Sequence, residues 1–179
     1  ICLFSFTSHY FNMANHYYVD DNPRWNQDMS GGAIYNDWGV INLDNVSFSG
    51  NYAKQISYDG DNPIVSTVKN DISNGSKLYF VGKASTLDGG IYGTGRTYFN
   101  LDEGEVMNIG ANTSIVQSTF EVNSGIVNIE NAGNITARGG FTVGENGILN
   151  IASGTMVIDN TYFKEIENSG KLYNNGTLD

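Results

Sequence analysis

The chain has 179 residues, of which 40% are hydrophobic and only 16% are charged, and it contains 22 Gly and 2 Pro. This length suits one ordinary domain, and the apolar content excludes a wholly disordered polymer. The formal net charge of −10 makes nucleic acids and anionic membrane surfaces poor partners, because like charges repel. Few charges and many glycines are typical of an all-β protein with many tight turns.

The start of the chain gives little information on targeting. Residues 1–6 are too short, and lack the basic flank, for a secretory signal, so we interpret the chain as a fragment. Cys2 is the single cysteine and cannot form an internal disulfide, which in an exported chain favours a bacterial product. No apolar stretch approaches the roughly 18 residues that a membrane helix needs.

Residues 1–30 are rich in aromatic side chains, including Trp25, and show no period. We predict that they form a cap or an irregular first coil, because the open end of a repeat fold exposes strand edges and core. His9 and His16 are seven residues apart and have no partner at zinc spacing, so no metal site is expected.

Two short motifs follow this segment. They are Gly31-Gly32-Ala33-Ile34 and Phe48-Ser49-Gly50-Asn51. This pair resembles the repeat of polymorphic outer-membrane proteins and related autotransporter passengers. The resemblance implies a right-handed parallel β-helix at the surface of a Gram-negative-type bacterium or secreted by it. It also implies membrane attachment only through a carboxy-terminal β-barrel, which we expect to lie outside this chain.

A looped insertion is predicted near residues 54–75. Asp59-Gly60-Asp61-Asn62 resembles the start of a calcium loop, but Pro63 follows, and Asn70 stands where an EF-hand has its bidentate Glu. We therefore interpret this cluster as an acidic turn. Gly93-Thr94-Gly95-Arg96 is likewise predicted to be a turn, because it lacks the Lys and the helix of a phosphate loop.

From residue 99 onward, three series of residues recur in phase. Phenylalanines stand at Phe99, Phe120, Phe141 and Phe163, spaced by 21, 21 and 22 residues, and Leu101, Val122, Val143 and Glu165 follow two positions later. Asparagines stand at Asn108, Asn128 and Asn150, continued weakly by Tyr173-Asn174, and a third series comprises Ile115, Ile135 and Val157. Three series with one period predict three short strands in each repeat.

A unit of three short strands cannot bury its own apolar face, but stacked units pair equivalent strands and pile equivalent side chains into one core. We therefore predict a parallel β-helix over residues 31–179, with about 21 residues per coil. An antiparallel sandwich would also have short strands and Gly-rich turns, but it gives no reason for the series to stay in phase. The repeated Asn is interpreted as a ladder of stacked amides or as a turn residue.

These patterns predict a non-catalytic surface protein with a structural, adhesive or immune-exposed role, and with no enzyme activity, metal or cofactor. Its expected partners are proteins or glycans on host or neighbouring cells, besides self-association, and nucleic acid is not among them. Trp25, Trp38 and Tyr58 are the predicted contact residues, because Trp and Tyr dominate interface energetics.

Two alternatives remain open. One is a carbohydrate-active β-helix, for which Asp59, Asp61 and Arg96 are the candidate polar groups, since such enzymes need converging carboxylates or calcium ligands with a basic residue. The other is a phage tail-fibre-like solenoid, which would be a trimer.

Overall fold

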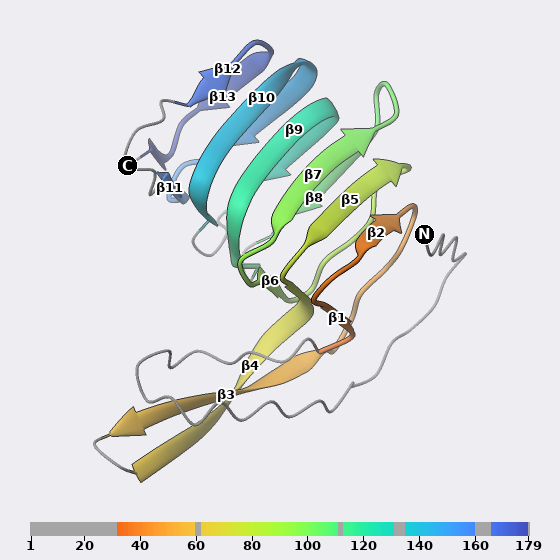
Figure 1. The fold of residues 1–179 in the computed structure, drawn as a ribbon. Coiled ribbons are helices and arrows are strands. Elements are labelled where there is room, and N and C mark those ends of the chain that lie inside the picture. Colours follow the sequence, from red (N-terminus) through yellow and green to blue (C-terminus); the bar gives the residue numbers. More distant parts are fainter. Residues whose placement is uncertain (1–31, 60–61, 111–112, 131–134, 160–165, 179) are drawn as a thin grey trace.

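The computed structural model describes residues 32–59, 62–110, 113–130, 135–159 and 166–178 (Figure 1). The regular elements in these ranges are all β-strands. They are β1 (Ile34–Asn36), β2 (Val40–Leu43), β3 (Tyr52–Asp59), β4 (Asn62–Asn74), β5 (Lys77–Gly82), β6 (Gly90–Tyr92), β7 (Arg96–Leu101), β8 (Val106–Ile109), β9 (Ile115–Ile129), β10 (Ile135–Ile151), β11 (Met156–Asp159), β12 (Glu167–Asn168), β13 (Lys171–Asn174) and β14 (Thr177–Leu178).

Parallel pairing arranges the strands in three columns along the axis of a β-solenoid (Figure 1). The first column contains β1, the end of β4, β6, the starts of β9 and β10, β11 and β14. The second contains β2, β5, β7, the middles of β9 and β10, and β12. The third contains β8, the ends of β9 and β10, and β13. Strands β9 and β10 therefore each run through one whole coil.

The coil length follows from the first column. Its equivalent residues Ile72, Ile91, Ile115, Ile135 and Val157 are separated by 19, 24, 20 and 22 residues. The predicted parallel β-helix, with coils of about 21 residues, is confirmed. The predicted equivalence of Ile115, Ile135 and Val157 is also confirmed.

The core is a set of side-chain ladders inside the coils. Along β7 and β9, buried and partly exposed residues alternate, as a strand with one inward face requires. Phe80, Phe99, Phe120 and Phe141 form one continuous stack, with ring centroids 5.2, 4.9 and 5.0 Å apart. All four rings are buried. Stacking every coil on the next therefore buries the apolar face that one coil alone would leave open.

The register differs from the prediction at one step of the Phe series. Phe120 pairs with Phe141 as predicted, but Phe99 pairs with Val122, and Phe120 lies opposite Thr97. The shift is two residues, so every side chain keeps its inward or outward face. The Phe99 and Phe120 rings still meet diagonally, and their planes are tilted by 45° instead of being parallel. Phe163 and Glu165 lie outside the described residues.

The Asn series forms the predicted ladder in the third column. Asn108, Asn128 and Asn150 occupy equivalent positions. Asn128 Nδ2 donates to Asn108 Oδ1 at 2.8 Å, and Asn150 Nδ2 donates to Asn128 Oδ1 at 2.6 Å. In the next coil Tyr173, not Asn174, takes the equivalent position.

A buried amide network holds the corner between the first and second columns. Asn36 Nδ2 donates to Asn74 Oδ1 at 2.8 Å, and Asn74 Nδ2 donates to Gln117 Oε1 at 2.7 Å. Gln117 Nε2 in turn donates to the Gly93 and Val116 carbonyls. Because buried amides are costly without partners, these contacts explain why polar side chains are tolerated inside the solenoid.

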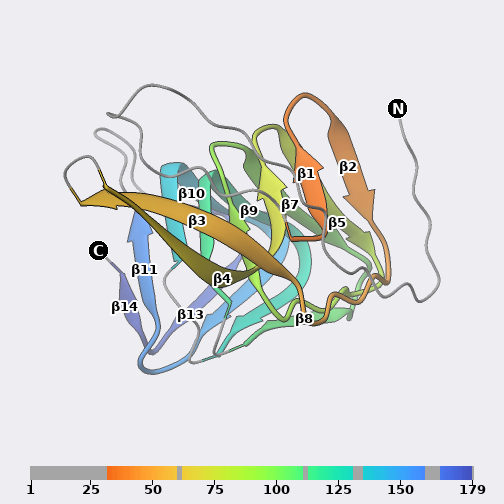
Figure 2. The same ribbon diagram turned by 90° about the horizontal axis from the view of Figure 1, so that it is seen from below.

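Strands β3 and β4 form an antiparallel hairpin that projects from the coils (Figures 1 and 2). It occupies the region where a looped insertion is predicted. Its insertion lengthens the first step of the first column, from Ile34 to Ile72, to 38 residues. The end of β4 then returns to the first column beside β1 and β6. Ile64 and Val65 are exposed on its projecting part.

Candidate functional site

The two predicted motifs meet at the base of the hairpin. Ala33 donates its backbone N–H to the Asp71 carbonyl at 3.0 Å, and Asn51 Nδ2 donates to Asp71 Oδ1 at 2.9 Å. A Cβ at Gly32 would overlap the carbonyl oxygen of Asn70. Ile34 pairs with Ile72, and the Phe48 side chain is buried in the core. The motif residues in the described ranges thus hold a structural corner, and Gly31 lies outside those ranges.

Asp71 is a fully buried carboxylate at this corner. Besides the Asn51 amide, it accepts the backbone N–H groups of Asp88 and Gly89 at 2.9 and 2.7 Å. Burial raises the pKa of Asp71, and the three donors counteract this only in part. The Asp88 carboxylate has the opposite shift: a 2.9 Å ion pair with Lys69 and the Gly50 N–H hold its pKa below the ordinary value.

We expect Asp71 to make the stability of the solenoid depend on pH. A carboxyl with a raised folded-state pKa binds more protons in the folded chain, so its contribution to stability grows as the pH falls through that pKa towards the unfolded value. Asp71→Asn lacks this titration. The unfolding free energy of the wild type, minus that of Asp71→Asn, should therefore increase as urea titrations move from neutral to mildly acidic pH. A decrease over that range would show that the buried carboxylate is better solvated than this geometry implies.

A second group of side chains lies on the outward side of β5 and β7, in the second column. Lys77 pairs with Arg96 in register, and Tyr79 pairs with Tyr98 two residues further along. The tyrosine rings are stacked, with centroids 4.5 Å apart and planes 10° apart. The inward residues of the same strands, such as Leu78 and Phe99, are buried, so the core fixes the spacing of the outward ones.

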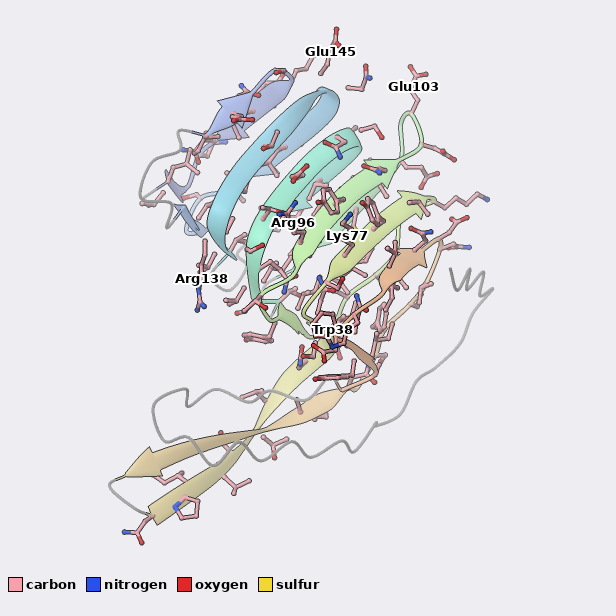
Figure 3. All side chains as sticks on the ribbon, in the orientation of Figure 1. Trp38, Lys77, Arg96, Glu103, Arg138 and Glu145 are labelled. Atoms are coloured by element: carbon pink, nitrogen blue, oxygen red, sulfur yellow. The ribbon has the colours of Figure 1, made fainter. Side chains whose placement is uncertain are left out.

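Trp38 lies at the corner between β1 and β2, two residues before β2 begins (Figure 3). Its side chain is 92% exposed. Lys77 hydrogen-bonds through its backbone N–H to the Gly39 carbonyl, which ties this corner to the start of β5. We call the surface formed by Trp38, Lys77, Tyr79, Arg96 and Tyr98 the tyrosine–cation face.

Two adjacent cations lie within this face, and the Asp37 carboxylate lies beside Gly75 at its Trp38 end. Lys77 and Arg96 are exposed and form no ion pair within the part of the chain that the structure describes. Glu121 is the in-register neighbour of Tyr98 and limits the face on that side. Burial, followed by the neighbouring Tyr98 and the Glu121 charge, raises the pKa of Tyr79, so its phenol stays protonated and can donate. The face therefore presents hydrogen-bond donors and two adjacent positive charges between flanking carboxylates.

The other predicted contact residues are not gathered at this face. Trp25 lies outside the described residues. The backbone of Tyr58 lies in β3, near the end of the hairpin that projects away from the coils (Figure 1). Of the three, Trp38 is the residue that the structure places, with its side chain exposed, at the corner before β2 (Figure 3).

The candidate polar groups of the carbohydrate-active alternative are also separated. Asp59 ends β3 at the projecting end of the hairpin, whereas Arg96 begins β7 in the second column (Figures 1 and 3). Asp61 lies outside the described residues. Within the described ranges, no three His, Cys, Asp or Glu side chains group together as ligands of a metal would. Nor does any described segment form a helix long and apolar enough to cross a membrane.

Comparison with known proteins found no matching family model, no similar curated protein and no similar solved structure.

Most of the tyrosine–cation face was not among the predicted contact residues. Arg96 was singled out for a different reason, and Lys77, Tyr79 and Tyr98 were missed. A sequence signal for them exists: Lys77-Leu78-Tyr79-Phe80 and Arg96-Thr97-Tyr98-Phe99 repeat a basic-x-Tyr-Phe pattern 19 residues apart. In a solenoid this repeat predicts that the two cations are neighbours on adjacent strands, and that the two tyrosines are neighbours as well.

Proposed function

We propose that this chain is a non-catalytic part of a bacterial cell-surface or secreted protein, in which a stiff β-solenoid presents surfaces for adhesion. The tyrosine–cation face is the observation that carries the proposal. Its strand residues point outward from β5 and β7, and the inward side chains of these strands pack in the Phe stack. Strands that are rigid before binding lose little backbone conformational entropy when a partner docks.

The two motifs at the hairpin base support an outer-membrane, autotransporter-type export route, because Gly32, Ala33, Ile34, Phe48 and Asn51 resemble the repeat of such passengers. In this proposal the partners are proteins or glycans of a host or neighbouring cell. The solenoid itself serves as the spacer that holds the face away from the membrane.

Surface location tests this proposal directly. Antibodies raised against the purified chain should label intact cells of the source organism or detect the chain in the culture medium. An antibody against a cytoplasmic protein, used on the same cells, is the control and should label only after permeabilisation. Labelling of this chain only after permeabilisation would contradict the proposal. A trimeric mass of the chain in solution would favour the phage tail-fibre-like alternative.

A further inference from the structure

Lys77 and Arg96 form a pair of like charges that folding does not require. They are in-register neighbours on adjacent strands, where like charges repel and destabilise the sheet. The chain as a whole carries a net charge of −10, and both side chains lack an ion-pair partner within the described residues. A concentrated positive spot on an acidic protein favours a negatively charged ligand at that spot.

The neighbouring tyrosines add hydrogen-bond donors, and these have the same strand-to-strand spacing as the two cations. Tyr79 and Tyr98 cover each other's ring faces and leave partly exposed edges on the outward side of the sheet. Each strand therefore contributes one cation and one phenol, and the pattern repeats after one strand spacing of about 4.8 Å. That spacing is close to the length of one pyranose residue, so a polysaccharide lying across β5 and β7 can contact both Lys77 and Arg96.

Trp38 supplies an apolar surface beside these charges. An indole that is 92% exposed leaves its faces open to a flat apolar partner. The carbon-bound hydrogens on one side of a sugar ring form such a partner, and the ring's hydroxyl and acidic groups remain at its rim for donors such as Lys77 and Arg96.

We propose that the tyrosine–cation face binds an acidic polysaccharide, whose carboxylate or sulfate groups contact Lys77 and Arg96 while a sugar ring packs on Trp38. This inference rests on the adhesive role proposed above and names its ligand class. The net charge of the chain repels nucleic acid and acidic polysaccharide alike, so single-stranded DNA is the competing polyanion in the test below. Anionic membranes fit less well, because electrostatic attachment to lipid uses clusters of about 4–8 cations.

Binding of fluorescent polysaccharides to the purified chain tests the inference. Polygalacturonate carries carboxylates, dextran sulfate carries sulfates, and unmodified dextran is the neutral control. We expect at least one acidic polymer to bind, more weakly as salt is raised, and dextran not to bind. Lys77→Gln/Arg96→Gln should weaken that binding by at least about tenfold, as expected when charged hydrogen bonds are lost. Trp38→Ala should also weaken it.

The matched control is Arg138→Gln/Lys171→Gln, which removes the same charge from exposed positions outside the face. It should keep nearly wild-type affinity. Equal losses in the two double variants, no binding of either acidic polymer at low salt, or tighter binding to anionic vesicles or single-stranded DNA would each overturn the inference. None of these results would alter the outcome of the surface-labelling experiment, so failure of the ligand and failure of the proposed location remain distinguishable.

Discussion

Replacing Phe120 with Ala is expected to lower the free energy of unfolding by about 3–5 kcal/mol. Phe120 lies in the middle of the buried stack, with the Phe99 ring 4.9 Å away on one side and the Phe141 ring 5.0 Å away on the other. Truncation leaves a cavity between two coils that the backbone hydrogen bonds hold at a fixed spacing, so the site cannot collapse. Urea unfolding followed by circular dichroism measures the loss.

Tyr173→Ala is the matched control for this truncation. It also removes an aromatic ring from a stacked strand, but that ring is 55% exposed. Its cost should stay below about 1 kcal/mol. If the two variants lost similar stability, the Phe stack would not be the main source of cohesion between the coils.

Gly93→Ala is expected to cost about 3 kcal/mol or more. Gly93 has a φ of +132°, which an L side chain rarely adopts, and a Cβ there would overlap the carbonyl oxygen of Asn74. Backbone strain and overlap therefore add at one position. The substitution would also disturb the Gly93 carbonyl that Gln117 contacts in the buried amide network.

Two other glycines separate the effect of backbone strain from the effect of steric overlap. Gly104 has a φ of +82° with open space around its Cβ position, so Gly104→Ala measures strain alone. Gly110 has open space and no left-handed φ, so Gly110→Ala should be nearly neutral. In thermal unfolding, the loss of stability should be largest for Gly93→Ala, smaller for Gly104→Ala and smallest for Gly110→Ala. A loss at Gly93 no larger than that at Gly104 would refute the overlap with Asn74.

The repeat series predicted the architecture because the physics of stacking acts on every coil in the same way. Asn128 lies between Asn108 and Asn150, and Ile135 lies between Ile115 and Val157, as their spacing indicates. The spacing of Phe99 and Phe120 predicted that they are in-register neighbours, and this was wrong, because the register there is offset by two residues. An offset of two keeps both rings in the core, so burial could be predicted where register could not.

The candidate site was less predictable, because it depends on neighbours that the period alone does not define. Trp38 was found from residue type, but its exposure follows from its place at a corner. Lys77 and Tyr79 precede the clearest part of the repeat, and their pairing with Arg96 and Tyr98 becomes evident only once β5 is aligned with β7. The sequence does not predict the burial of Asp71, because this burial results from the way the hairpin returns to the coils.

Distances between spin labels along the outward row of the second column test the solenoid most directly. Asn42, Tyr79, Tyr98, Glu121, Thr142 and Glu167 are successive in-register neighbours in that row. With Cys2 replaced by Ser, one label is placed at Asn42 and the other at Glu121, Thr142 or Glu167. Stacked coils predict distances near about 14, 19 and 24 Å, rising by one strand spacing at each step. Distances that fail to rise in this order would contradict the parallel stacking on which the tyrosine–cation face depends.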